Sequence, residues 1–115
     1  MKVKFSDQNG NDVTYHIHDN ELGRAFCRLL PMTVKMTKSG SNELQFSSPK
    51  RMNTFGATQA PGGLEGLCYH QPWNEILLYY GGYSEYEDLY EIGMPIAGQG
   101  AVKYLRGPVL VEQVI

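Results

Sequence analysis

The sequence predicts a mainly β fold, a closed barrel of about eight strands with two short α-helices. Apolar residues alternate with polar ones in many short segments, which is the period of a half-buried strand. Turns that contain glycine or proline separate these segments, and only two segments carry helical spacing. This pattern favours a sandwich or a barrel, and a barrel leaves no edge strand to aggregate.

The first residues predict a β-hairpin. Val3 and Phe5 alternate with polar neighbours, and residues 13–17 alternate in the same way. Asn9-Gly10 lies between the two segments, in a polar stretch. Glycine tolerates the positive φ that a tight turn requires, so the pair predicts the turn of the hairpin.

A helix is predicted next, because apolar residues recur three and four positions apart over residues 22–30. Asp19 or Asn20 can cap its first turn by accepting backbone N–H groups. Pro31 disfavours helical geometry at the preceding residue and should end the helix. Gly23 weakens the prediction slightly, since glycine is a poor helix former.

The rest of the chain predicts strands over residues 32–36, 43–47, 67–70, 75–80, 89–94 and 109–114. Turns are expected at 38–42 and 71–74, and irregular loops at 48–63 and 81–88. The 75–80 segment is almost entirely apolar, so it should be a central strand covered on both faces. Pro95 should stop the strand before it, and a short helix should follow Gly98.

Length and charge exclude several classes of protein. The 115 residues fit one domain, 1–115. A net charge of −2 gives no basic surface, so no nucleic-acid partner is expected. No apolar run is long enough to cross a membrane, and the first residues lack a signal-peptide core. Cys27 and Cys68 stand far apart without a CxxC pair, which indicates reduced thiols in a cytoplasmic protein, with a disulfide between them as the less common alternative.

The order of elements resembles the cyclophilin barrel, and short motifs add to the resemblance. Stretches including Gly66–Asn74 (GLCYHQPWN), Leu77–Gly81 (LLYYG) and Leu89–Gly93 (LYEIG) resemble a small prokaryotic cyclophilin-like family. The resemblance covers nearly the whole chain and is most specific between Gly66 and Gly98. It implies a compact eight-stranded barrel, and the family has no settled activity.

Cyclophilins catalyse rotation about X–Pro bonds, but the motifs that carry this activity are absent. The sequence has no Phe-His-Arg triplet and no Gln-Gly-Gly-Asp. Where the resemblance implies Gln-Phe-Phe, the chain reads Glu75-Ile76-Leu77. No catalytic residue is therefore carried over, and Arg51 is the one arginine expected near the barrel mouth. A prolyl isomerase with rebuilt catalytic residues stays an alternative function.

The leading expectation is a barrel that binds a small molecule or peptide at an aromatic-lined mouth. The 48–63 loop and the 83–86 loop should form this mouth. The candidate ligand-binding residues are Arg51, Phe55, Tyr69, Trp73, Tyr79, Tyr83 and Tyr86. The same aromatic residues could instead fill the core or, in a third hypothesis, join two barrels as a homodimer.

Other candidate sites have simpler interpretations. His16 and His18 share a strand face but lack an obvious third metal ligand, so solvent-facing hairpin positions are expected. Cys68 and His70 could pair as nucleophile and base, although a buried structural cysteine is more common. The acidic residues Glu85, Glu87, Asp88 and Glu91 are expected in a solvated loop. No metal and no cofactor are predicted.

Overall fold

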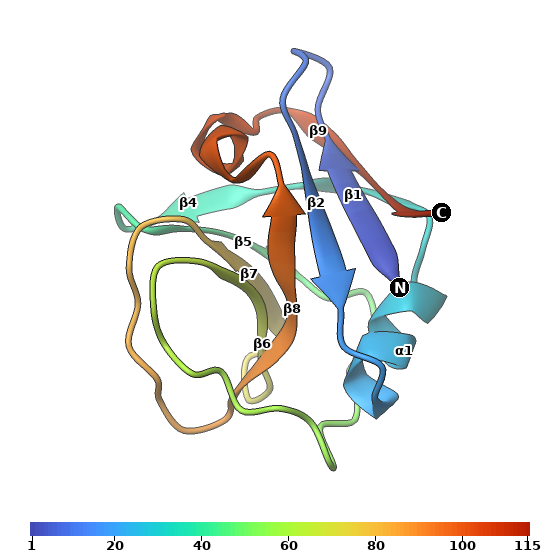
Figure 1. The fold of residues 1–115 in the computed structure, drawn as a ribbon, viewed down its shortest axis with the longest axis vertical. Coiled ribbons are helices and arrows are strands. Elements are labelled where there is room, and N and C mark those ends of the chain that lie inside the picture. The colour runs from blue at the N-terminus through green and yellow to red at the C-terminus, as the bar shows by residue number, and fades with distance from the viewer.

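A computed structural model describes residues 1–115 as an antiparallel barrel with nine strands, one α-helix and one 3₁₀ helix (Figure 1). The elements are β1 Lys2–Ser6, β2 Asp12–Ile17, α1 Glu21–Arg28, β3 Met32–Lys35, β4 Thr37–Ser39, β5 Glu43–Ser47, β6 Gly66–His70, β7 Glu75–Tyr79, β8 Leu89–Ala97, η1 Gln99–Tyr104 and β9 Pro108–Val114. Neither helix is long enough to cross a membrane. The predicted mainly β fold is confirmed.

The sheet closes through one broken strand. Its order is β3-β9-β1-β2-β8-β6-β7-β5-β4. β3 and β4 are consecutive and are separated only by Met36, yet β3 pairs with β9 and β4 pairs with β5. Counted as a single interrupted strand, they give the predicted eight. The predicted turn at 38–42 is shorter than expected, because Lys38 and Ser39 belong to β4.

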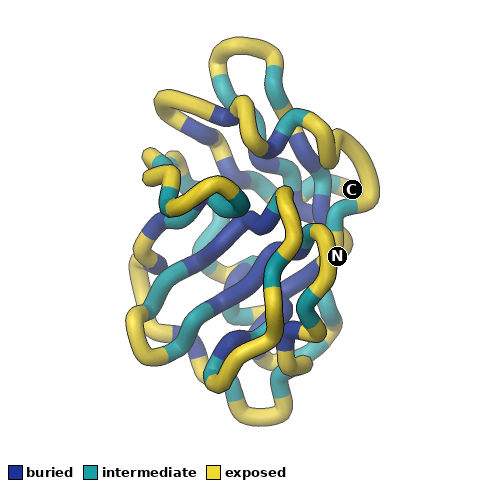
Figure 2. The backbone as a smooth tube through the Cα atoms, turned by 90° about the vertical axis from the view of Figure 1, so that its left-hand side faces the viewer, coloured by how far each residue is buried: buried dark blue, intermediate teal, exposed yellow.

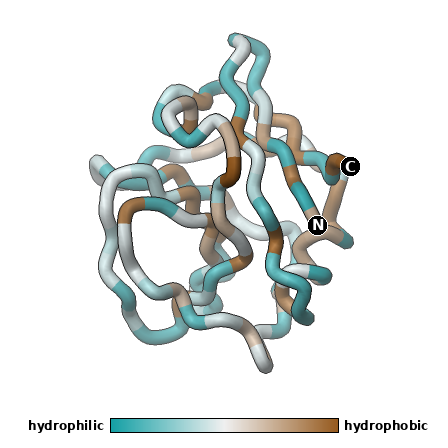
Figure 3. The backbone as a smooth tube through the Cα atoms, viewed as in Figure 1, coloured by the Kyte–Doolittle hydropathy of each residue, from teal (hydrophilic) through white to brown (hydrophobic).

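The barrel interior is filled by the apolar side of each strand. Inward residues such as Val3, Phe5 and Tyr15 are fully buried, and the buried positions follow the strands in Figure 2. Apolar and hydrophilic residues alternate along the β1–β2 hairpin in Figure 3, as the sequence pattern predicts. The hairpin turn holds Gly10 at a φ of 86°.

The two helices pack against opposite ends of the barrel. α1 buries Leu22 and Phe26 in the core, where the Phe26 ring stacks on Phe5 with centroids 6.4 Å apart. η1 lies near the other end and contributes Val102 to the same core, and Leu105 follows it there (Figure 1). The second helix is a 3₁₀ helix and not the predicted α-helix. It connects β8 to β9, a common place for a 3₁₀ helix, although its six residues make it longer than most.

The start of α1 depends on two residues. Asn20 is the N-cap, and its side chain accepts a hydrogen bond from the Gly23 N–H at 2.9 Å. An ideal Cβ at Gly23 would lie 1.9 Å from the His18 carbonyl oxygen, so no larger side chain fits there. Glycine is therefore required by packing against the preceding chain, despite its low helix propensity.

Pro95 does not stop its strand, contrary to the sequence prediction. β8 continues through Pro95 to Ala97. The ladder with β2 shifts register between Thr14 and Tyr15, opposite Pro95. A proline fits at such an irregularity because its missing N–H costs no ladder hydrogen bond.

A second apolar layer covers part of the outer barrel surface. Ala60, Cys68, Leu77, Tyr79 and Leu89 form a buried cluster outside the barrel, with Tyr83 packed against it. The loops that carry Ala60 and Tyr83 run side by side in Figure 1 and are joined by a bridge between Gly63 and Tyr83. Residues 76–79 are buried, which confirms that the β7 segment is covered on both faces.

Candidate ligand-binding face

The outer face of β5, β7, β6 and β8 brings polar side chains and aromatic rings together. Side chains alternate along β7, so Ile76 and Leu78 enter the core while Glu75, Leu77 and Tyr79 point outward. Strand pairing places Ser47, Glu75, His70 and Leu89 in one cross-strand row. Gln45, Leu77, Cys68 and Glu91 form the next row.

Three rings form an exposed aromatic patch, which we define as His70, Trp73 and Tyr86. The His70 ring meets Trp73 and Tyr86 nearly edge to face, with centroids 5.5 Å and 5.3 Å away. Trp73 is 71% exposed, an unusual position for the largest apolar side chain. Exposed aromatic rings that are held in place by neighbours are suited to contact a ligand.

A stack of tyrosines supports this patch. The Tyr79 and Tyr83 rings are parallel within 9°, with centroids 4.1 Å apart. The Tyr79 and Tyr86 hydroxyls are 3.3 Å apart. Burial raises the pKa of both Tyr79 and Tyr86 above the usual tyrosine value, so the stack stays neutral at physiological pH.

Acidic side chains border the patch. Glu75 pairs across the strands with His70. Glu43 pairs with Tyr79, and one of its carboxylate oxygens is buried without a hydrogen-bond partner. Burial raises the pKa of Glu43, and the nearby Glu75 carboxylate raises it further. The face thus combines aromatic rings with carboxylates, which is a suitable surface for a cation.

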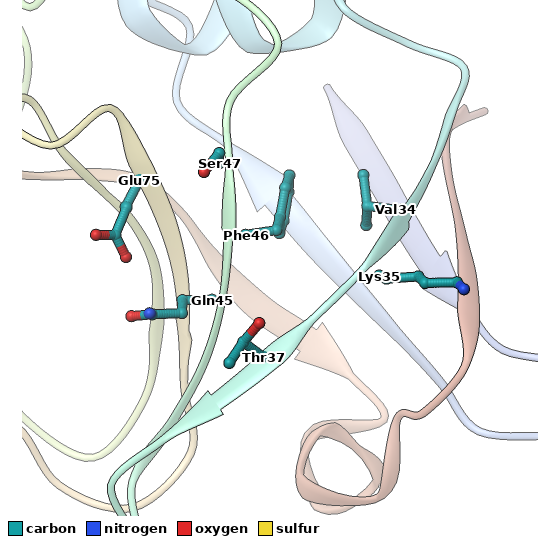
Figure 4. A pocket seen from close by; sticks show the side chains of 7 residues that line it. All are labelled: Val34, Lys35, Thr37, Gln45, Phe46, Ser47 and Glu75. Atoms are coloured by element: carbon teal, nitrogen blue, oxygen red, sulfur yellow. The ribbon is translucent and has the colours of Figure 1, made fainter.

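A groove of about 500 Å³ opens beside the patch, between β3 and β5 (Figure 4). Its lining residues are Val34, Lys35, Thr37, Gln45, Phe46, Ser47 and Glu75. Glu75 belongs both to the groove and to the border of the patch. In Figure 4 the Lys35 amine and the Glu75 carboxylate lie on opposite sides of β5 and point away from each other, so neither neutralises the other.

The residues expected to form one mouth are distributed over different parts of the surface and the core. Trp73 and Tyr86 meet through His70, and Tyr79 contacts both Tyr83 and Tyr86. Tyr69 instead faces the barrel interior and is fully buried. Phe55 is 88% exposed on the 48–63 loop.

Two of the candidates fasten the loop to the neighbouring turn. The Arg51 guanidinium donates to the carbonyls of Gln71 and Pro72, at 2.9 Å and 3.4 Å. The Tyr69 hydroxyl accepts from the Met52 N–H and donates to the Asn74 side chain at 2.6 Å. These contacts hold the turn that carries Trp73.

The acidic residues are not all solvated, and Glu91 corrects that expectation. Glu85 and Glu87 are exposed, whereas Glu91 is only 5% exposed on the outer face of β8. One of its oxygens is 2.7 Å from His18 Nε2. His18 is therefore not a free hairpin side chain either. The sequence did contain a signal for this burial. Glu91 lies two residues after the apolar Leu89 on one strand, so the two side chains share a face.

The second Glu91 oxygen lies buried without a hydrogen-bond partner. Cys68 is its cross-strand neighbour, and the thiol lies 3.8 Å from the Tyr83 hydroxyl. Burial raises the pKa of Cys68 to about 12, which keeps the thiol protonated and unreactive. No group of three or more His, Cys, Asp or Glu side chains in residues 1–115 could hold a metal ion.

An antiparallel barrel closed through an interrupted strand, with a helix at each end, defines the class of protein as a cyclophilin-like barrel. A family model described as the Cyclophilin-like family matches residues 6–112. The chain therefore belongs to this family. No curated protein matches it.

Proposed function

We propose that this barrel binds a small molecule or peptide at the aromatic patch and the adjoining groove. The observation that carries the proposal is the exposed Trp73, held beside His70, whose cross-strand partner is Glu75. Ligand sites commonly combine aromatic side chains with a few polar groups that orient the ligand. The two free cysteines are consistent with a reducing compartment such as the cytoplasm.

The chemistry of the face favours a cationic ligand. Aromatic rings attract an ammonium or guanidinium group by about 0.5–2 kcal/mol, depending on exposure. Glu75 adds a carboxylate beside the rings, and Glu43 lies farther along the same face. The ligand class that fits is therefore an organic cation or the basic side chain of a peptide.

Trp73 provides a direct test because it is the only tryptophan in the chain. Its emission is measured while choline, acetyl-arginine amide, acetyl-lysine amide, acetyl-proline amide and acetyl-glutamate amide are titrated separately. The proposal expects a saturable change with the cations, with a Kd of about 1 mM or lower. An unchanged emission with every cation contradicts the proposal.

A pair of variants checks that the carboxylate contributes. Glu75→Gln should weaken cation binding about threefold to fivefold, which corresponds to an exposed ion pair worth up to about 1 kcal/mol. The matched control is Glu112→Gln on β9, where the carboxylate lies opposite Lys4 and away from the patch. An equal loss of cation affinity in both variants would mean that the overall charge of the barrel attracts the cation, and that Glu75 has no specific role.

The two other hypotheses stay predictions. For the isomerase, Arg51 would have to leave the carbonyls of Gln71 and Pro72 before it could reach a substrate. A protease-coupled proline-peptide assay of the protein and of Arg51→Ala decides this question. For the homodimer, sedimentation at high concentration distinguishes a monomer from a pair of barrels.

A further inference from the structure

The barrel closes along only half of the broken strand. The ladder between β4 and β5 runs from Ser39↔Glu43 to Thr37↔Gln45 and then stops. In the same register the next hydrogen-bonded pair would be Lys35 with Ser47. That pair does not form, and β3 pairs with β9 alone. We call the resulting gap, between residues 32–35 and residues 46–47, the seam.

Ser47 presents its main-chain groups to the seam. The Ser48 N–H donates to the Asn74 carbonyl, and the Tyr80 N–H donates to the Asn42 carbonyl. In an antiparallel ladder, alternate residues bond to the same neighbour. The even-numbered residues of β5 therefore bond to β7, and the N–H and C=O of Ser47 point to the opposite side.

The same alternation identifies the free groups of β3. The Asp7 N–H donates to the Asn11 carbonyl, and the Ile17 N–H donates to the Met1 carbonyl. The odd-numbered residues of β1 therefore form main-chain hydrogen bonds with β2. The even-numbered residues of β1 thus bond to even-numbered residues of β9, which leaves odd-numbered β9 residues to bond β3.

Val111 and Val109 of β9 are opposite Met32 and Val34, so these two β3 residues bond to β9. Thr33 and Lys35 therefore direct their N–H and C=O groups into the seam. Pro108, which has no N–H, lies opposite Lys35 and agrees with this assignment. None of the main-chain bonds in turns and loops uses Thr33, Lys35 or Ser47.

The groove lies in this seam. Its apolar lining residues, Val34 and Phe46, are packed with the barrel core, so the groove reaches between the strands (Figure 4). An extended residue in a sheet occupies about 160 Å³, from a rise of about 3.4 Å, a strand spacing of about 4.8 Å and a layer spacing of about 10 Å. The groove volume of about 500 Å³ therefore suits about three residues.

We propose that the seam binds an extended peptide segment of a partner protein, which adds to the free edge of β3 and places a basic side chain at Glu75. Thr33 and Lys35 supply the donors and acceptors for strand addition. Glu75 lines the groove as the cross-strand partner of Ser47, and the Lys35 amine points away from its carboxylate, which leaves that charge for a basic side chain of the peptide. This inference names the ligand of the proposed function and rests on it for the role of Glu75.

The test uses pools of capped tetrapeptides and the full chain labelled with ¹⁵N. Each pool fixes arginine, glutamine or glutamate at one position and mixes valine and threonine at the others. With the arginine pools, the amides of Thr33, Lys35 and Ser47 should shift and exchange more slowly. Binding should be about tenfold weaker with glutamine than with arginine, and pools methylated on alternate amides should not bind.

The outcomes separate the inference from the proposed function. A response of Trp73 emission without any change at the three seam amides overturns strand addition and leaves the proposed function standing. No response at either place overturns both. Equal responses to arginine, glutamine and glutamate support strand addition but overturn the role of Glu75.

A substitution at the edge provides an independent readout. Lys35→Pro removes one donor that faces the seam and keeps the ladder with β9, because that N–H is not used there. It should bind the arginine pools about tenfold more weakly than Lys35→Ala, which keeps the donor. Thermal unfolding verifies that both variants fold. Equal affinities of the two folded variants would refute the hydrogen-bonded edge.

Discussion

His18 Nε2 lies 2.7 Å from Glu91 Oε1, and this contact joins the end of β2 to the buried outer face of β8. The main-chain N–H of His18 also donates to the Ile92 carbonyl, so a main-chain and a side-chain contact both join the end of β2 to β8. His18 is 29% exposed while Glu91 is almost fully covered. The imidazole is thus the one side-chain partner of a covered carboxylate, and it reaches only one of the two oxygens.

The first prediction concerns this pair. His18→Ala should lower the free energy of unfolding by about 1–3 kcal/mol, because Glu91 would keep no side-chain partner for either oxygen. Urea unfolding at pH 7 measures the change. His16→Ala, at an exposed position of β2, is the control and should change stability little.

A double variant tests the coupling. The double variant His18→Ala with Glu91→Gln no longer carries the buried charge. Its free energy of unfolding should therefore fall by less than the sum of the decreases in the two single variants. Additive losses would mean that the short contact contributes nothing to stability.

The second prediction concerns Gly23. Helix propensity alone favours alanine by about 1 kcal/mol. An added Cβ would lie 1.9 Å from the His18 carbonyl oxygen, and this steric clash outweighs the gain in helix propensity. Gly23→Ala should therefore destabilise the protein by about 1–3 kcal/mol.

Gly100→Ala in η1 is the matched control, because an added Cβ there meets nothing within 4 Å. It should leave the melting temperature unchanged or raise it slightly. A melting temperature of Gly23→Ala at or above that of the unchanged protein would refute the packing argument.

The sequence could predict those elements whose pattern is local. The β1–β2 hairpin follows from alternation and from Asn9-Gly10, and the helix follows from apolar spacing between Asn20 and Pro31. The end of β8 could not be predicted, because Pro95 is tolerated only through a register shift against β2, a partner far away in the chain.

The candidate site was harder to predict than the fold. Tyr69 and Tyr79 were expected to line one mouth, but they point to opposite faces of the sheet. Strand register decides this, since Tyr69 pairs with the inward Ile76 while Tyr79 pairs with Gly66. The loops around Ala60 and Tyr83 have no periodicity, so nothing in the sequence indicated that they cover the outer face.

The third prediction concerns the pH dependence of stability. Burial alone would raise the pKa of Asp7, but hydrogen bonds from the Asn11 side chain and from the backbone N–H groups of Asn11, Asn9 and Arg106 lower it to about 2. A carboxylate whose folded pKa is depressed stabilises the protein above its unfolded pKa of about 3.9. That contribution is lost as the pH falls toward 2.

Asp7→Ala should therefore be less stable than the unchanged protein at pH 7. The difference should narrow between pH 4 and pH 2, where Asp7 becomes protonated in the unchanged protein. Urea unfolding at several pH values measures both curves. Curves that stay parallel down to pH 2 would show that the ionised carboxylate is not the stabilising form.

The fourth prediction concerns the two thiols. Cys68 is fully buried beneath the loop of Tyr83, and burial holds its pKa near 12. Cys27 on α1 is half-buried, and burial raises its pKa as well. Because only the thiolate reacts, iodoacetamide at pH 8 should modify Cys27 slowly and should leave Cys68 unmodified in the folded protein.

In urea both cysteines should react, and mass spectrometry of the digested protein counts the label at each position. Rapid labelling of Cys68 without urea would show that the loops over the outer face open readily, and would place the thiol within reach of a ligand.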